Sequence, residues 1–194
     1  MKQGFVKVAS ATPRIRVADP VYNAQVICEQ AKEAAEHGAK IVVFPELCIT
    51  GYTCNDLFLQ ELLLEKAKEA LLTIVEETGQ LEALFLVGLP VDKDGRLYNV
   101  AAVLYRGRIL GMIPKKNIPM YAEFYEGRHF TPGEETVTEY RLGKQEIPFG
   151  TNLLFRCEEL PELILGCELC EDLWVAEPPC TDGSYSHCES VGLQ

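Results

Sequence analysis

The chain has 194 residues, of which 47% are hydrophobic and 24% are charged, a composition typical of one globular domain with a buried core. Its net charge of −11 and its pI near 4.8 argue against a nucleic-acid partner, because binding to phosphates needs clustered Lys and Arg side chains. No apolar run approaches the roughly 20 residues of a membrane helix and no secretory signal opens the chain, so we expect a cytoplasmic protein with no membrane partner.

The first elements expected along the chain are a strand, a helix and a second strand. Residues 4–10 have the short apolar pattern of a strand. Asp19 and Pro20 then supply an N-cap and a proline at the first helical position, and apolar residues recur at helical spacing up to Gly38. Residues 40–44 are almost wholly apolar, which is typical of a central strand covered on both faces.

A second helix follows. The apolar spacing over residues 57–78 is helical, with Asn55 and Asp56 as N-cap candidates and Gly79 at the end of the helix. Residues 83–89 then have the composition of another buried strand.

The rest of the chain favours consecutive strands. Residues 97–105 and 108–113 predict a hairpin that turns at Arg106 and Gly107. Two further strands are expected at 151–156 and 163–169. Because helices and strands alternate early and strands follow one another later, we expect an α/β (α+β layered) domain with helices outside its sheets.

The eight cysteines would suit a disulfide framework in a small secreted protein. This chain has no secretory signal and enough apolar residues to fold without crosslinks, so we expect reduced thiols. Cys28, on the apolar face of the first helix, is expected to be a small buried hydrophobic residue. The same interpretation applies to Cys48 and Cys54, which flank a turn.

A carboxylate follows the strand expected at residues 40–44. Pro45 fixes the backbone just ahead of Glu46, which places the carboxylate at an edge of the sheet, where sites are often built. A lone Pro-Glu pair is more often a helix cap or a solvated glutamate, so this position by itself predicts no function.

Two lysines, Lys115 and Lys116, follow the expected hairpin. Such a pair is usually solvated, but the segment after it is unusually rich in aromatic and acidic residues. Its aromatic side chains can wall a pocket, and Glu123 offers a second carboxylate.

A cysteine follows the last expected strand. The apolar run at residues 163–169 leads into Cys170 and then into acidic residues, so we expect this cysteine on a strand-to-helix turn with backbone N–H groups nearby. Such a turn can stabilise a thiolate and an oxyanion. A single cysteine without other evidence is more often buried and inert.

Taken in order, these three places resemble the catalytic blocks of the nitrilase superfamily. The matching segments are FPELCITGY at 44–52, PKKNIPMYAEFYEGRHF at 114–130 and CELCEDLW at 167–174. The last two resemble more narrowly the N-terminal glutaminase domain of glutamine-dependent NAD synthetases, and the likeness spans roughly residues 6–179. The resemblance implies a nitrilase-type α-β-β-α sandwich, C-terminally incomplete here.

The resemblance also implies roles for single residues. Glu46 matches the general base, Lys115 the catalytic lysine in preference to Lys116, and Cys170 the nucleophile of a thioester mechanism. Three further residues are expected near the substrate: Tyr121, where the synthetases contact glutamine, Glu123, where the superfamily has a second, orienting glutamate, and Glu171, whose backbone N–H would help to stabilise an oxyanion.

The domain and partners follow from the same resemblance. We expect a partial glutaminase domain over residues 1–194, with an atypical small and polar tail at 180–194 and no synthetase domain. Its substrate would be glutamine or another small carboxamide, and its partners the synthetase domain of a longer parent and a second copy of itself. The amidase step would need neither metal nor cofactor, and ATP and magnesium would serve only the synthetase domain. Alone, the chain is expected to have weak or no glutaminase activity.

Two alternatives remain open, and a third class of enzyme is disfavoured. The first is an omega-amidase or carbamoylase of the same superfamily, whose last block normally lacks the CEDLW continuation. The second is a non-enzymatic zinc module, because Cys167 and Cys170 have metal-ligand spacing and Cys180, His187 and Cys188 follow. The disfavoured class is a papain-like protease, which would need one of only three histidines beside Cys170. His37 ends a surface-facing helical turn, and His129 and His187 lack a recognisable surrounding signature.

Overall fold

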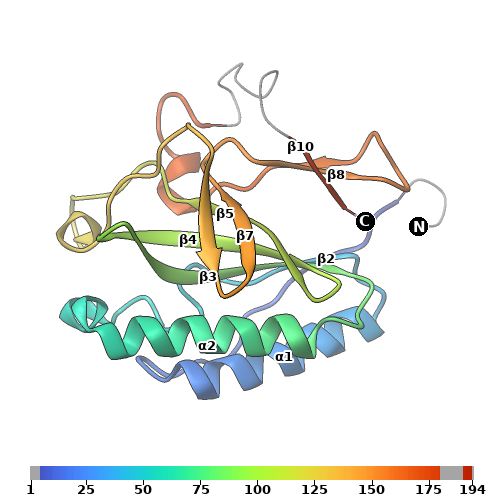
Figure 1. The fold of residues 1–194 in the computed structure, drawn as a ribbon, viewed down its shortest axis with the longest axis horizontal. Coiled ribbons are helices and arrows are strands. Elements are labelled where there is room, and N and C mark those ends of the chain that lie inside the picture. Colours follow the sequence, from blue (N-terminus) through green and yellow to red (C-terminus); the bar gives the residue numbers. More distant parts are fainter. Residues whose placement is uncertain (1–4, 180–189, 194) are drawn as a thin grey trace.

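The computed structural model describes residues 5–179 and 190–193, which form two sheets and two α-helices (Figure 1). The larger sheet has the strand order β1-β2-β3-β4-β5-β7-β6 and the smaller one the order β10-β8-β9. The strands of the larger sheet are β1 (Val8–Ser10), β2 (Ile41–Val43), β3 (Leu84–Lys93), β4 (Arg96–Tyr105), β5 (Arg108–Pro114), β6 (Thr138–Leu142) and β7 (Gln145–Phe149). Those of the smaller sheet are β8 (Leu154–Cys157), β9 (Ile164–Leu165) and β10 (Ser190–Leu193).

The larger sheet is mixed. Strands β1, β2 and β3 are parallel, as is expected where a helix connects successive strands, and β3, β4 and β5 are antiparallel. The predicted hairpin at β4 and β5 is confirmed. The hairpin of β6 and β7 was not predicted, although Tyr140 and Ile147 show the alternate burial of a strand pair.

Helices α1 (Pro20–Glu36) and α2 (Glu61–Glu77) lie side by side on one face of the larger sheet (Figure 1). The predicted start of α1 is confirmed, because Pro20 opens the helix and the backbone N–H of Tyr22 donates to Oδ1 of Asp19 at 3.1 Å. Within the described part of the chain, no helix is long and apolar enough to span a bilayer.

The second predicted helix begins later than expected. Residues Asn55–Leu59 form a separate 3₁₀ helix (η1), and Gln60 is extended, with φ −90° and ψ 121°, before α2 begins at Glu61. The proposed caps are therefore wrong, since the Asp56 carboxylate accepts hydrogen bonds from Arg128 instead, at 2.7 and 2.9 Å. The physical reason is tertiary: Phe58 of η1 is buried edge-on against Phe130, a contact that helical spacing along the chain does not indicate.

The predicted strands also differ in length from those observed. Strand β3 continues through Pro90 to Lys93, although the apolar pattern predicted an end near residue 89. A proline is tolerated there because β2 pairs with β3 only as far as Leu86, so the later part of β3 has β4 as its only strand neighbour among the described residues. The strand predicted at residues 163–169 is instead shorter than expected, because β9 has only two residues.

The core lies on both faces of the larger sheet. The face toward α1 and α2 is filled by apolar side chains such as Val42 and Phe85, and the opposite face is covered in part by Phe155 of β8 and by Leu153, which directly precedes β8. The α/β class with helices outside the sheets is confirmed. The prediction that the strand at residues 40–44 is covered on both faces is wrong at Val43. This side chain is 43% exposed on the face toward the smaller sheet.

Candidate active site

Glu46 lies in a tight loop directly after β2, and this loop rests on β3. A Cβ on Gly88 of β3 would lie 2.4 Å from the backbone nitrogen of Leu47 and 2.7 Å from the carbonyl oxygen of Pro45. Only glycine therefore lets the loop approach the strand this closely. The backbone N–H of Ile49 then donates to the carbonyl of Gly88 at 3.1 Å, which fixes the loop and the carboxylate it carries.

Lys115 follows the last residue of β5 and is fully buried. Its backbone N–H donates to the carbonyl of Asn99 on β4 at 2.8 Å, which extends the hairpin ladder by one hydrogen bond. Its Nζ donates to Oε1 of Glu46 at 2.8 Å and to Oε1 and Oε2 of Glu126 at 2.7 and 3.0 Å. The predicted proximity of Glu46 and Lys115 is confirmed.

Glu126, and not Glu123, is the second carboxylate at this ammonium. Glu123 is exposed, whereas the side chain of Glu126 is 3% exposed and lies at the start of a short 3₁₀ helix, η2 (Glu126–Arg128). The prediction that Glu123 orients the lysine is therefore wrong. The segment between Lys115 and η2 contains no regular element, so a count of residues along it could not indicate which glutamate turns inward.

The two carboxylates beside Lys115 are held differently. Both oxygens of Glu126 accept hydrogen bonds, Oε1 from Lys115 and from the Tyr52 hydroxyl at 2.8 Å, and Oε2 from Lys115. Glu46 accepts both of its hydrogen bonds at Oε1, from Lys115 and from Nδ2 of Asn99 at 2.8 Å. Among the described residues no donor reaches its Oε2, and the side chain is 19% exposed. Glu126 thus has the geometry of a fixed counter-ion and Glu46 that of a base with one free oxygen.

Electrostatics keep the buried lysine charged. Burial alone would lower the pKa of Lys115, but the hydrogen bonds that its ammonium donates to Glu126 and Glu46 outweigh this and raise the pKa. A permanently charged ammonium suits the stabilisation of a developing oxyanion rather than proton transfer.

Cys170 opens a one-turn 3₁₀ helix, η3 (Cys170–Leu173), as the sequence pattern predicts. Cys170 is exposed. Its backbone φ of +47° lies in the left-handed region, a form of strain that concentrates at functional sites. Burial of the sulfur and the negative charge of Glu46 raise the pKa of this thiol, while the charge of Lys115 and the backbone N–H of Glu171 act in the opposite direction. The sulfur is therefore within electrostatic reach of both Glu46 and Lys115.

Asp172 links the cysteine turn to the lysine strand, and sequence reasoning missed it. This side chain is almost fully buried and accepts the backbone N–H groups of Asn117 at 2.7 Å and of Lys116 and Leu169 at 3.3 Å. It also accepts Nδ2 of Asn117 at 2.9 Å. Because these donors come from both sides of the site, Asp172 fixes η3 relative to the end of β5.

Tyr121 and Glu171, two of the residues expected near the substrate, contact each other at the surface. The Tyr121 hydroxyl donates to Oε2 of Glu171 at 2.8 Å, and this hydrogen bond raises the pKa of the phenol. Glu171 directly follows Cys170 in η3, so this hydrogen bond links Tyr121 to the cysteine turn.

Replacing Glu46 by Gln is expected to move the alkylation of Cys170 to lower pH. The Glu46 carboxylate raises the pKa of the Cys170 thiol, and a neutral amide does not, so the thiolate forms at lower pH in the variant. Iodoacetamide labelling read at Cys170 by peptide mapping, over neutral and alkaline pH, measures the midpoint. Glu139→Gln, which removes the same charge from an exposed residue of β6, is the control and should leave the midpoint in place. An unchanged midpoint in Glu46→Gln would contradict the proximity of the two groups.

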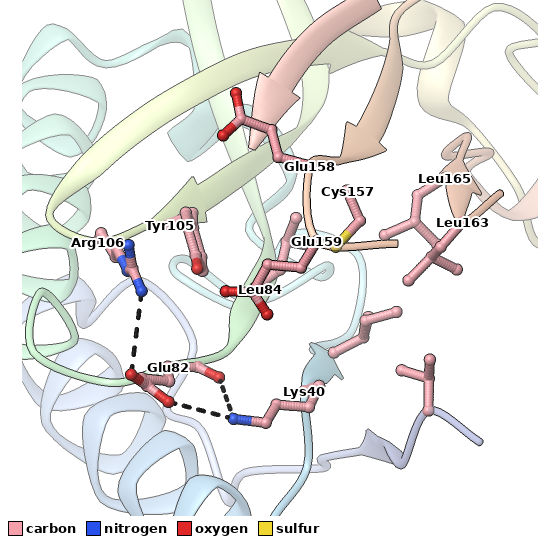
Figure 2. A pocket seen from close by; sticks show the side chains of 12 residues that line it. Lys40, Glu82, Leu84, Tyr105, Arg106, Cys157, Glu158, Glu159, Leu163 and Leu165 are labelled. Carbon is pink, nitrogen blue, oxygen red and sulfur yellow. Dashed lines mark hydrogen bonds and ion pairs between the residues drawn. The ribbon is translucent and has the colours of Figure 1, made fainter. Parts of the chain in front are cut away.

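A cavity of about 290 Å³ lies away from these residues, between the two sheets. Figure 2 shows its lining, with Lys40 and Arg106 paired to Glu82 at one side and Leu163 and Leu165 at the other. None of the groups around Lys115 contributes to it.

The zinc alternative finds no ligand set within residues 5–179 and 190–193, where no group of three or more His, Cys, Asp or Glu side chains is placed to hold a metal ion. Cys167 and Cys170 are both free. Cys180, His187 and Cys188, the remaining candidate ligands, lie outside the described residues, as does most of the tail noted at 180–194.

Residues 7–181 match the model of the carbon-nitrogen hydrolase family. The glutamine-dependent NAD(+) synthetase of Mycobacterium tuberculosis is 39% identical over 185 residues, which cover 95% of this chain and 27% of that protein. A solved glutamine-dependent NAD(+) synthetase from Cytophaga hutchinsonii has 27% identity and a TM-score of 0.72, over 79% of this chain and 28% of its own. An amidase from Nesterenkonia sp. has the same fold, with 23% identity and a TM-score of 0.56, over 78% of this chain and 55% of its own.

These matches confirm the resemblance inferred from the three blocks, including the narrower likeness to the synthetases, and they confirm the nitrilase type of the fold. The chain spans little more than a quarter of the length of the synthetases it matches. Catalytic roles for single residues stay predictions that rest on the geometry above.

Proposed function

The chain belongs to the carbon-nitrogen hydrolase family, and we propose that it hydrolyses the side-chain carboxamide of glutamine to glutamate and ammonia through Glu46, Lys115 and Cys170. The observation that carries the proposal is the buried ammonium of Lys115, which bonds Glu46 directly and acts electrostatically on the Cys170 sulfur. A carboxamide is a poor electrophile with a poor leaving group, so its hydrolysis needs a nucleophile, a proton carrier and a positive charge in one place.

The first half of the reaction forms a thioester. The free Oε2 of Glu46 takes the thiol proton as the sulfur of Cys170 attacks the carboxamide carbon, and the carbonyl oxygen becomes an oxyanion. Lys115 and the backbone N–H of Glu171 stabilise that oxyanion, and loss of one such donor typically costs about 3 kcal/mol of transition-state stabilisation. Glu46 then returns its proton to the nitrogen, the C–N bond breaks, and ammonia leaves.

The second half regenerates the thiol. Glu46 takes a proton from water, the hydroxide adds to the thioester carbon, and the C–S bond breaks with the proton returning to sulfur. The raised pKa of Cys170 agrees with this sequence, because a resting thiol needs a base at the moment of attack. Both proposed half-reactions use only groups of this chain, the substrate and water.

The choice of glutamine rests on the relatives and on the rim of the site. Glutamine-dependent synthetases match nearly the whole chain at up to 39% identity. Tyr121 and Glu171 stand beside Cys170 and offer a hydroxyl and a carboxylate, groups that can bind the ammonium end of an amino acid. Glu123 is kept as a third candidate for this rim.

As part of the same proposal, the ammonia serves a synthetase domain in a longer parent, where deamido-NAD would be amidated to NAD with ATP and magnesium. The M. tuberculosis relative, of which this chain covers 27%, supports such a fusion. The six cysteines of the described segments are free, in agreement with work in a reducing compartment such as the cytoplasm. Assembly with a second copy of the chain also belongs to this proposal.

Ammonia release by the natural polypeptide that carries this chain tests the substrate. Glutamine, asparagine and succinamate are compared at equal concentration, with Cys170→Ala as the blank. We expect kcat/KM to be highest for glutamine. A higher value for succinamate would replace the proposal by the omega-amidase alternative, and equal ammonia from the blank would contradict the chemistry itself.

A further inference from the structure

Asn99 stands out as a buried polar residue in the middle of an apolar strand. It is 0% exposed and lies on β4 between buried neighbours, opposite Pro90 of β3. Its side-chain Oδ1 is buried and has no hydrogen-bond partner in the described structure. An unpartnered buried acceptor is unfavourable, so packing alone does not explain an amide at this position.

The contacts of Asn99 reach both charged groups of the site. Its carbonyl accepts the backbone N–H of Lys115 at 2.8 Å, and its Nδ2 donates to Oε1 of Glu46, also at 2.8 Å. A longer contact of 3.5 Å joins Nδ2 to Oε2 of Glu126. One residue therefore holds the backbone of the lysine and the carboxylate of the base.

We propose that Asn99 is a positioning residue that occupies Oε1 of Glu46 and leaves Oε2 free to exchange a proton with Cys170. This inference rests on the proposed function, since it assigns the two oxygens of the base different tasks. Lys115 and Asn99 together give Oε1 two donors, while no donor among the described residues reaches Oε2. Rotation of the carboxylate would break both hydrogen bonds, so the free oxygen keeps its direction.

The amide suits this task because it donates without adding charge. A second cation at Oε1 would compete with the proton that Glu46 must accept, whereas a hydrophobic side chain would leave the carboxylate free to rotate. Asparagine fixes the oxygen and leaves the site with one ammonium and two carboxylates.

The test compares Asn99→Leu with Asn23→Leu. Asn23 is an equally buried asparagine outside the site, whose Nδ2 donates to the carbonyls of Arg16 and Ile49 at 2.7 and 2.9 Å. In Asn99→Leu we expect kcat for glutamine to fall about 10- to 100-fold with KM nearly unchanged. Asn23→Leu should change neither.

A second arm shows that Asn99 acts through Glu46. In a Glu46→Gln background, Asn99→Leu should cause no further loss of kcat, as two residues acting as one unit are not additive. Asn99→Ser, smaller and also unable to reach Glu46, carries the same test if Asn99→Leu does not fold. The inference would be overturned if Asn99→Leu lowered kcat no more than Asn23→Leu does. It would also be overturned if the losses of kcat from Asn99→Leu and Glu46→Gln were fully additive in the double variant.

Alkylation of Cys170 by chloroacetamide separates this inference from the proposed function, since it requires no amide hydrolysis. In a Glu46→Gln background, Asn99→Leu should leave the labelling rate unchanged. A labelling rate at neutral pH that changes in Asn99→Leu but not in Asn23→Leu supports the positioning role, even if no variant releases ammonia from glutamine. In that case the proposed function fails and the inference about Asn99 stands. Equal labelling in both variants would contradict the role of Asn99, whatever the hydrolysis assay shows.

Discussion

Cys170→Ala is expected to lower carboxamide hydrolysis by roughly 10⁴-fold or more, because it removes the atom that forms the thioester. The fold should survive, since the residue is exposed and begins a one-turn helix whose main anchor is Asp172. Ammonia release from glutamine and thermal unfolding, measured on the same preparation, separate the two effects.

Cys167→Ala is the matched control. Cys167 lies three residues earlier and packs against the core between the sheets, and burial raises the pKa of its thiol to about 12. A thiol that resists ionisation so strongly is a poor nucleophile. We expect Cys167→Ala to keep most of the activity. Equal losses in the two variants would contradict the assignment of Cys170 as nucleophile.

Lys115→Met is expected to abolish hydrolysis and also to destabilise the domain by about 3–5 kcal/mol. The ammonium is fully buried between Glu46 and Glu126, so its removal leaves two carboxylates close together without a cation. Methionine has nearly the same volume, which keeps a packing defect from causing the loss. Urea unfolding gives the change in stability, and single-turnover ammonia release gives the change in rate.

Lys116→Met tests the same substitution one residue later. The Lys116 ammonium pairs with Glu135 at 2.8 Å, and that carboxylate is half exposed. Removing an exposed ion pair typically changes stability by no more than about 1 kcal/mol. Activity should remain near that of the unchanged chain. Similar losses in both lysine variants would mean that the buried ammonium has no special role.

The candidate site residues could be located from the sequence because each follows a short apolar run. Glu46, Lys115 and Cys170 all lie directly after such runs, and three ordered blocks are more specific than any one of them. The convergence of these residues is a property of strand order. Strand β3 separates β2 from β4 and β5, and no local pattern indicates that order.

The glutamate that neutralises the lysine could not be chosen from spacing. Between Lys115 and Glu126 the chain has no regular element, so helical or strand periodicity gives no face to count from. Tertiary contacts decide the outcome: Tyr52 and Lys115 both donate to Glu126. The same limit applies to the start of α2, which packing of Phe58 determines.

Two supporting residues did carry a signal in the sequence. Asn99 is a polar residue within an apolar strand, and Gly88 is a glycine within another. Such exceptions to a strand pattern often mark a buried polar contact or a close backbone approach. Both residues help to hold Glu46. The Asn99 side chain donates a hydrogen bond to its carboxylate, and Gly88, which has no Cβ, lets the loop that carries Glu46 pack against β3.

Peptide mapping of an acid-quenched reaction with glutamine tests the central claim most directly, namely that Glu46, Lys115 and Cys170 act as one site. The expected result is a glutamyl thioester on the peptide that contains Cys170, lost in both Glu46→Gln and Lys115→Met and retained in Lys116→Met. A glutamyl adduct on another residue, or a thioester that forms at an unchanged rate in both Glu46→Gln and Lys115→Met, would contradict it.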